Sequence, residues 1–414
     1  MVAKEVFVDM HEPYHQLLRS IRHFRRVDIL FGLCSLDLNE RIANPTSSRR
    51  ISKFLRFVNS LYMLLIWGGL IATFLFWMWL LGERGDLGGS SLANVDGIAS
   101  ATFYGANFVA VLSLRIAWFW QKEKYLHAWT KLYNSPNLFL IEGIKMHFLN
   151  PLILFVFHTL ATDMLVIREA LTGHIIKDQV GPTIMILIGF SISSMLTIYI
   201  KMAGKIIVCY TYRIKSGQIK NLQELLKRAS RAVEFNNVKT LFMKIEETAA
   251  EFNRVFTPLL IITIANDLID LVNCLYFGIT RLISLNHALE TTGTESAMTI
   301  FKLLPPWCLI AVSLLELTWL CEEGQRLQNA MEEFRRELHK ANTLLLDEEA
   351  KLELALFTTQ LSGKVGTPSV GGFFSVNRRL FIGILGSITT YLIVLLQSNG
   401  STQGVNERHG NNTT

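Results

Sequence analysis

Apolar segments long enough to cross a bilayer recur along the chain and alternate with polar stretches. About 20 consecutive apolar residues suffice for a transmembrane helix. Within lipid, only helices and closed barrels satisfy the hydrogen bonds of their own backbone. The pattern therefore predicts an all-α protein with seven transmembrane helices, at about 57–82, 98–120, 147–167, 182–212, 255–285, 303–321 and 379–398.

Helical spacing of apolar residues continues beyond the fourth and sixth spans. One stripe runs from Leu222 to Phe256 and another from Leu320 to Leu345, each flanked by charged residues. An apolar stripe needs a partner, and the mixture of acids and bases favours a helical assembly over an anionic membrane surface. The predicted organisation is a cytoplasmic N-terminal helical segment (1–56), transmembrane helices 1–6 (57–321) with long cytoplasmic helices near 213–256, a cytoplasmic helical anchor and linker (322–378), transmembrane helix 7 (379–398) and an extracellular tail (399–414).

Positive charge is distributed unevenly between the two sets of loops. The chain has 414 residues, is 50% hydrophobic and carries a net charge of +6. The loops after spans one, three and five and the C-terminal tail hold six basic residues, namely Arg84, Arg168, Lys177, Arg281, Lys302 and Arg408. Because cytoplasmic loops attract Lys and Arg, the N-terminus is expected inside and the C-terminus outside. The first fifty residues lack a cleavable signal peptide, so the first span is expected to direct insertion. The excess charge thus indicates topology rather than a nucleic-acid partner.

The sequence contains no recognisable catalytic or cofactor motif. A Gly-rich phosphate loop, a nucleophile elbow and an HExxH pair are all missing from the sequence. Its five cysteines show no CxxC spacing, which argues against a disulfide framework or a metal site. We therefore expect neither enzyme activity nor a cofactor.

The fifth span carries an unusual polar patch of Asn266, Asp267, Asp270 and Asn273. An Asp at mid-membrane costs roughly 2.5–3.5 kcal/mol, so the patch should face protein or water. Two interpretations stay open: a pocket wall that binds hydroxyls or a cation, and a structural pairing with a base or with water. Asp270, Asn273 and Tyr276 lie toward the outer side and are the better ligand-binding candidates.

Other polar or aromatic residues in the spans are candidates for the same pocket. His158 is expected to be buried and hydrogen-bonded rather than bound to a metal, and Glu316 either pairs with a base or attracts cations. Trp307 follows Pro305 and Pro306 at the predicted start of span six, as an interface anchor or a stacking platform. The remaining candidates are Thr102, Tyr104 and Asn107 in span two and Asp163 in span three.

The last span ends in an uncharged amide. Thr390 and Tyr391 are followed by five aliphatic residues and Gln397. A Gln in hydrocarbon is costly unless it finds a partner or water, and a pore supplies water. Val394 shares a helix face with Gln397, so copies around an axis would form an amide ring beside an apolar ring that gates by dewetting. Ser398 is a third candidate for this face. The alternative is an interhelical hydrogen bond for Gln397 and lipid contact for Val394.

The C-terminal motif resembles the signature of the insect gustatory receptor family, within the superfamily of gustatory and odorant receptors. The resemblance rests on Gly372, Phe373 and Phe374, a short polar spacer, and then Thr390, Tyr391 and Gln397 in the last span. The family usually places Phe after the Gln, where this chain has Ser398. Seven spans, an inside N-terminus and long cytoplasmic helices agree with the family.

The resemblance implies a nonselective cation channel in the plasma membrane of sensory neurons, opened directly by a tastant and assembled as a homotetramer or together with related receptor subunits. Span seven of each subunit would line the pore. The ligand would bind in a pocket opening outward among spans two to six. Two alternatives stay open: a seven-helix membrane transporter, which the lack of internal repeats disfavours, and a G-protein-type chemoreceptor, which the inverted topology disfavours.

Overall fold

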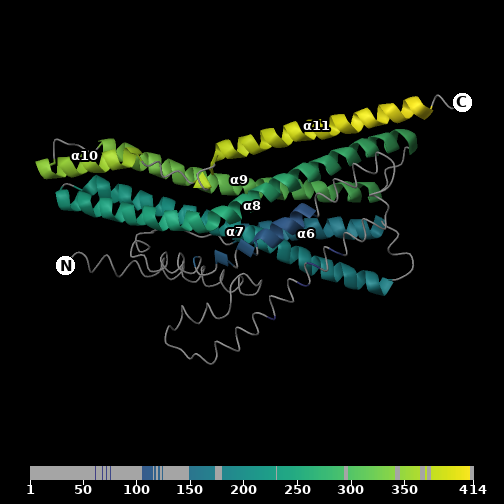
Figure 1. Ribbon diagram of the computed structural model, residues 1–414, viewed down its shortest axis with the longest axis horizontal. Coiled ribbons are helices and arrows are strands. Elements are labelled where there is room, and N and C mark those ends of the chain that lie inside the picture. The colour runs from purple at the N-terminus through teal and green to yellow at the C-terminus, as the bar shows by residue number, and fades with distance from the viewer. Residues whose placement is uncertain are drawn as a thin grey trace.

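The computed structural model is an elongated bundle of long helices (Figure 1). It describes residues 105–114, 149–172, 180–229, 231–292, 297–340, 346–363, 369–370 and 374–410, with scattered positions between 61 and 124. The labelled helices are α6 (Leu149–Thr172), α7 (Val180–Arg228), α8 (Ala232–Thr292), α9 (Ala297–Lys340), α10 (Glu348–Gly363) and α11 (Arg378–Gly410). A short antiparallel pair, β1 (Ser369–Val370) and β2 (Phe374–Ser375), precedes α11.

Helices α7, α8 and α9 are much longer than a bilayer requires. They contain 49, 61 and 44 residues. At 1.5 Å per residue the shortest of them extends over about 66 Å, against a hydrocarbon thickness of about 30 Å. The prediction that spans four, five and six continue as long helices is therefore confirmed.

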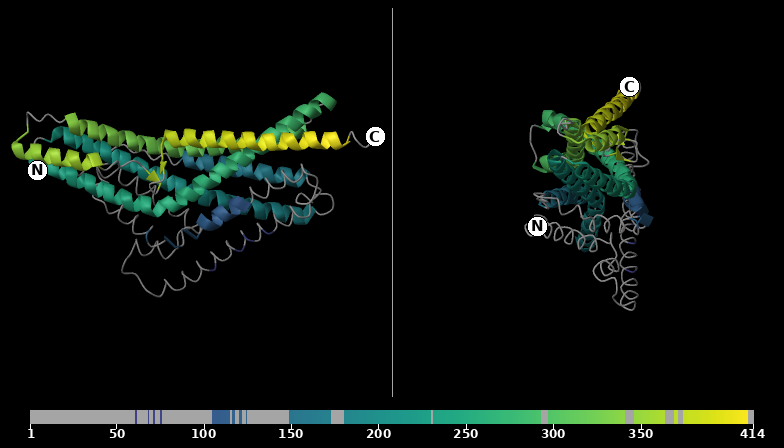
Figure 2. Two further views of the ribbon diagram at one scale, coloured as in Figure 1. Left: turned by 45° about the horizontal axis from the view of Figure 1, so that its top comes forward. Right: turned by 90° about the vertical axis from the view of Figure 1, so that its left-hand side faces the viewer.

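Helix α7 lies at the centre of the bundle and packs against α6, α8 and α9 (Figures 1 and 2). Helix α10 covers α8 and α9 at the end where α7 meets α8. Helix α11 lies along the outside of the bundle. Its extensive contacts are with α8 and α9. One half of the bundle, called the membrane-type half, contains α6, α11 and the parts of α7, α8 and α9 that pack against them. The remaining parts of α7, α8 and α9 form an extension together with α10.

The stripe predicted from Leu222 to Phe256 is two helices rather than one. Helix α7 ends at Arg228, and α8 begins at Ala232 after a tight connection. The backbone N–H of Arg231 donates to the Glu234 carboxylate at 3.1 Å, which satisfies a donor that the first turn of a helix leaves free. The second predicted stripe is helical to Lys340 in α9, residues 341–345 lie outside the described residues, and α10 then packs against α8 and α9.

Three phenylalanine rings pack together in the core of the extension. Phe242 of α8 and Phe334 of α9 have ring centroids 5.3 Å apart, and Phe357 of α10 meets them edge-on at 5.7 and 6.1 Å. All three side chains are almost fully buried. Aromatic pairs of this geometry contribute about 0.5–1.5 kcal/mol to stability beyond their buried area. Phe357 therefore helps to hold α10 against α8 and α9.

Two predicted helix ends are wrong in detail. Pro305 and Pro306 do not start the sixth helix, because α9 begins at Ala297 and carries both prolines inside. Proline removes a backbone donor, a loss that neighbouring helices make tolerable in transmembrane helices. Helix α11 runs to Gly410, twelve residues past the predicted end of span seven. Within the predicted anchor and linker segment (322–378), α10 extends to Gly363.

The start of α11 is attached firmly to α9. The side-chain oxygen of Asn377 accepts from the backbone N–H groups of Arg379 and Leu380 at 3.0 and 3.2 Å, an N-cap. Its amide nitrogen donates to Gln328 of α9 at 3.2 Å, and Arg378 forms a two-pronged pair with Glu322. We call these contacts the α9–α11 junction.

Gly324 of α9 allows the backbone of Val376 to come close to α9 at this junction. A Cβ added there would lie well inside van der Waals contact of the Val376 carbonyl oxygen and 2.9 Å from the carbonyl carbon. Glycine is the residue that permits such a backbone approach. The absence of a side chain at Gly324 therefore fixes where the chain turns into α11.

Candidate functional site: a buried charge network

Ionisable side chains from four helices meet in the interior of the membrane-type half. Helix α7 supplies two lysines, Lys201 and Lys205, one turn apart on the same face. Their partners come from α8, α9 and the helix of residues 105–114, and α6 joins through His158, which contacts Glu316. Charges in such surroundings are affordable only when they are paired and hydrogen-bonded, and each of these lysines is.

The first cluster centres on Asp270. Its carboxylate accepts from Lys201 at 2.9 Å, from the Asn107 amide at 2.6 Å and from the Asn266 amide at 2.7 Å. Lys201 also donates to the Asn107 side-chain oxygen. Three donors therefore surround one carboxylate and join α7, α8 and the helix of residues 105–114.

The second cluster lies one turn along α7 and centres on Lys205. Its ammonium lies 2.6 Å from the Asp267 carboxylate and 2.7 Å from the Glu316 carboxylate. The other Glu316 oxygen lies 2.8 Å from Nδ1 of His158. The Lys205 ammonium thus links α7 to α8 and α9, and Glu316 links α9 to His158 of α6.

These contacts bear on the open interpretations of three residues. Asp267 and Asp270 are paired with lysines, and Glu316 is paired with a base, as one of its two interpretations expected. His158 is buried apart from 12% of its side chain and is hydrogen-bonded, as predicted. Asn107 and Asp270, two of the ligand-binding candidates, contact each other directly.

Three of the other candidates lie on α8 and α9. Asn273 is buried and donates to the backbone of its own helix at Ile269, 3.0 Å away. Tyr276 is buried against Phe277. Trp307 is 37% exposed, and its indole lies 3.4–3.6 Å from the Cβ position of Gly278. Asp163 is half-buried farther along α6. Thr102 and Tyr104, with Gly372 and Phe373 of the C-terminal motif, lie outside the described residues, and Phe374 is half-buried in β2.

The two lysines are the residues that the sequence analysis overlooked. Both lie inside the fourth apolar window, and neither is among the candidate residues named from the sequence. Two lysines at i and i+4 within an apolar span are a signal for buried acidic partners, because a lone ammonium there is costly. Their pairing with the acids of spans five and six follows only from the packing.

One face of helix α11 consists of small and polar residues that are exposed in this structure. At 100° per residue, Gly383, Ser387, Thr390, Val394 and Gln397 fall within about 80° of arc. All five are exposed, and Val394 is 55% exposed. The opposite face packs on the bundle through Ile384 and Ile388. Ser398 belongs to α11, and its side chain lies outside the described residues.

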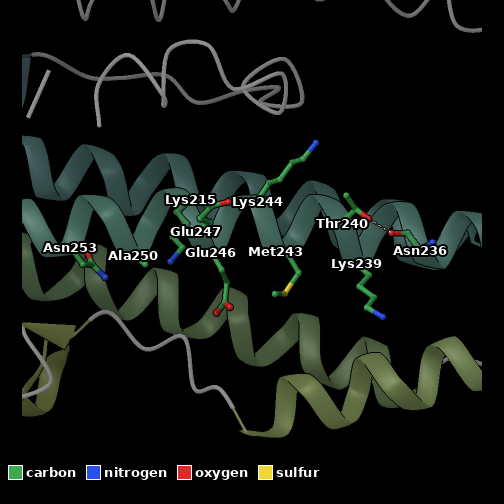
Figure 3. Close-up of a pocket in the computed structure, with 10 residues that line it drawn as sticks. All are labelled: Lys215, Asn236, Lys239, Thr240, Met243, Lys244, Glu246, Glu247, Ala250 and Asn253. Atoms are coloured by element: carbon green, nitrogen blue, oxygen red, sulfur yellow. Dashed lines mark hydrogen bonds between the residues drawn. The ribbon is translucent and has the colours of Figure 1, made fainter. Parts of the chain in front are cut away.

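A cleft of about 770 Å³ borders α8 in the extension (Figure 3). Side chains of α8 from Asn236 to Asn253 line it together with Lys215 of α7. Only 8% of Lys215 is exposed, and burial lowers its pKa to about 8, a shift that nearby Glu246 partly offsets. Within the described ranges, no group of three or more His, Cys, Asp or Glu residues could hold a metal ion.

Together, the fold and the network define the class of protein. Two described stretches, Ala232–Thr280 and Leu304–Lys340, are long and apolar enough to cross a membrane, and Gly105–Leu114 and Ile153–Met164 are shorter apolar helices. Apolar helices of this length are those that span a bilayer in polytopic membrane proteins. The chain belongs to the 7tm chemosensory receptor family, whose sequence model matches residues 26–399.

Individual relatives agree with the family. The chain is 24% identical over 180 residues to gustatory and odorant receptor 24 of Anopheles gambiae, covering 43% of this chain and 36% of that protein. It is 26% identical over 168 residues to gustatory receptor 28b of Drosophila melanogaster, covering 41% of this chain and 34% of that protein. The chain therefore matches about a third of the length of these relatives.

The fold is similar to that of a solved insect olfactory receptor. The structure of receptor OR5 from Machilis hrabei superimposes with a TM-score of 0.67 and 14% identity, covering 94% of this chain and all of that chain. The same receptor in complex with eugenol superimposes with a TM-score of 0.59 and 15% identity, over 91% and 99% of the two chains. At these identities the similarity shows the all-helical fold of a seven-transmembrane family.

Proposed function

We propose that this protein is a gustatory receptor of the sensory-neuron plasma membrane that opens as a nonselective cation channel when a tastant binds. The family, the two gustatory relatives and the C-terminal motif support this assignment. The N-terminus and the long extension lie on the cytoplasmic side, and the C-terminus lies outside. The bundle itself converts ligand binding into conduction, with no enzymatic step.

The observation that carries the channel proposal is the open face of α11. Small and polar residues line this face, directly opposite the side that packs on the bundle. Against lipid, the Gln397 amide would lose contact with water, whereas the Ser387 and Thr390 hydroxyls already donate to the backbone carbonyls of Gly383 and Gly386. Four copies of α11 around a common axis give these groups water and give each helix neighbours.

Val394 and Gln397 are the proposed gate and filter. Four Val394 side chains would form an apolar ring that closes the pore by dewetting. Four Gln397 amides, one turn farther out, would replace part of the hydration of a passing cation. Ser398 lies beside this ring, where the family usually has Phe.

The tastant is proposed to bind in the outer half of the bundle, at the charge network and on its outer side. Asp270 and Asn107, with Thr102, Tyr104, His158, Asp163, Asn273, Tyr276 and Trp307, are the candidate residues. A similar receptor fold that has been solved with a small molecule, eugenol, supports a ligand site within such a bundle. Carboxylates and amides suit a polar, hydroxyl-bearing ligand.

Expression of the protein alone in cells without heterotrimeric G-protein signalling tests the proposal. A panel of sugars and bitter compounds is screened by calcium imaging, and active compounds are then applied during whole-cell recording. We expect ligand-evoked cation current, with an altered reversal potential in mixed cations for Gln397→Ala. Ile393→Ala, which is exposed on α11 but off the polar face, is the matched control and should behave as wild type.

Two results would count against the channel. Current that needs co-expressed G proteins would favour the receptor alternative. Normal current whose ion preference resists substitution of Ser387, Val394 and Gln397 would remove α11 from the pore.

A further inference from the structure

The cleft beside α8 in the extension has room for a small molecule. Its volume of about 770 Å³ lies within the range of roughly 300–1,000 Å³ that is usual for sites of small ligands. Its lining is mostly polar and comprises three lysines, two glutamates, two asparagines, a threonine, a methionine and an alanine. The cleft belongs to the extension, whereas the charge network and the proposed tastant site belong to the membrane-type half. Neither the pore nor the tastant therefore accounts for it.

Lys215 of α7 is the side chain in this cleft that lacks a direct partner. Only 8% of the residue is exposed, yet within the part of the chain that the structure describes its ammonium makes no hydrogen bond or salt bridge. Figure 3 shows Lys215 beside Glu246, Glu247 and Ala250 of α8. The Glu246 carboxylate attracts the ammonium without forming a salt bridge. A buried ammonium without a direct counter-charge is unfavourable, and an anion in the cleft would supply that counter-charge.

The rest of the lining indicates which anion fits. Lys239 and Lys244 of α8 add positive charge along the cleft, although Lys239 is shared with Glu353 of α10 at 3.3 Å. Lysine ammonium groups are common ligands of phosphate. The ionised Glu246 and Glu247 carboxylates only accept hydrogen bonds, so they suit hydroxyl groups on a ligand and disfavour a second phosphate.

We propose that this cleft binds a phosphate group attached to a polyhydroxylated ring or chain, with the phosphate on Lys215 and the hydroxyls on Glu246 and Glu247. The ligand would then join α7 to α8. This chemistry has two sources, a soluble sugar or inositol phosphate and the headgroup of an inositol phospholipid. Lys215 and Asn253 lie within three residues of the predicted inner ends of spans four and five, at 212 and 255, so a headgroup at the membrane surface can reach this end of the cleft.

Acetylation of lysines in the purified full chain, held in phosphatidylcholine nanodiscs, tests the proposal. Acetic anhydride reacts with the neutral amine, and burial holds the pKa of Lys215 at about 8, so at about pH 8 half of the Lys215 side chains are reactive. A bound phosphate favours the ammonium and covers it, so saturating myo-inositol 1-phosphate should slow acetylation of Lys215 by about tenfold or more. Peptide mass spectrometry reads the rate at each lysine. Lys340, which is 71% exposed at the end of α9, is the internal control and should react at an unchanged rate.

The same measurement separates the two sources. Nanodiscs that contain phosphatidylinositol, with no soluble ligand, should protect Lys215 if the headgroup is the occupant, whereas protection by myo-inositol 1-phosphate alone identifies a soluble ligand. Inorganic phosphate and phosphatidic acid carry the phosphate without the polyol and should protect less in their respective arms. Equal protection by these two controls would overturn the assigned ligand class, and no protection in either arm would overturn the site.

Variants locate the phosphate on Lys215. Binding is measured by calorimetric titration with myo-inositol 1-phosphate, or by native mass spectrometry of retained phosphatidylinositol if the lipid arm is positive. Lys215→Met should weaken binding by about tenfold or more, whereas Lys215→Arg keeps the positive charge and should retain most of the affinity. Lys340→Met is the matched control and should bind as wild type. Unchanged binding by a folded Lys215→Met protein would overturn the assignment.

The wild-type acetylation rates keep the test decisive if the Lys215 variants do not fold. None of these measurements needs ionic current or an agonist. Failure of this proposal is therefore distinguishable from failure of the proposed channel function.

Discussion

Substituting Gly324 with Ala is the most direct test of how α11 is attached to the bundle. Propensity alone predicts that Gly→Ala inside a helix stabilises by about 1 kcal/mol. The structure predicts the opposite sign, because the new Cβ would overlap the Val376 carbonyl oxygen and lie 2.9 Å from its carbon and 3.1 Å from Cγ1.

The size of the effect follows from what must move. The nearest atoms belong to the backbone, which cannot rotate away as a side-chain tip can. Forcing a methyl group into a filled site costs roughly 1–3 kcal/mol, so the net effect should be a destabilisation of up to about 2 kcal/mol after the gain in helix propensity. The cost should fall on the α9–α11 junction, which joins Asn377 to Gln328 and Arg378 to Glu322.

Two further variants make the measurement specific. Gly383→Ala, in α11, has nothing within 4 Å of its new Cβ and should be neutral or slightly stabilising. Val376→Ala combined with Gly324→Ala should give little recovery, because it leaves the carbonyl in place. The thermal midpoint of each purified protein in nanodiscs reports stability, and hydrogen exchange of residues 374–385 reports the junction itself. A Gly324→Ala protein at least as stable as wild type, with unchanged exchange at the junction, would refute this account of the close approach.

Three further outcomes are expected. Lys201→Met leaves Asp270 buried without its cation and should destabilise by about 3–5 kcal/mol, whereas the double change with Asp270→Leu should recover much of the loss, as thermal unfolding will show. Because burial holds the pKa of Lys215 near 8 and an unfolded chain has the ordinary 10.5, the unfolded state binds more protons between these values. Wild-type stability should therefore rise from about pH 8 to about pH 10.5 by up to roughly 3 kcal/mol, and a chain with Lys215→Met should lose that rise. Asn377→Ala removes the N-cap of α11 and should cost about 1 kcal/mol, with faster hydrogen exchange in its first turn as the measurement.

The sequence by itself determined the class of fold and its long helices. Apolar runs of bilayer length leave the backbone only the helical solution, and helices α6, α7, α8, α9 and α11 cover the segments predicted as spans three to seven. The stripes beyond spans four and six indicated helices outside the membrane, since an apolar face at helical spacing requires a partner. The same stripes failed to show the turn after Arg228, because apolar spacing resumes in α8 on the far side of the connection.

The tertiary structure alone decided how the polar residues are paired. Lys201 and Asp270 are 69 residues apart, and His158 and Glu316 are 158 apart, so no local pattern specifies either contact. The same holds for Gly324, which in the sequence only weakens a helix and in the fold admits a carbonyl from a segment 52 residues away. Local periodicity records which face of a helix avoids water, whereas ion pairs and close backbone contacts depend on the packing of distant helices. For that reason the sequence indicated an all-helical membrane receptor, and only the packing of α6, α7, α8 and α9 revealed its buried charge network.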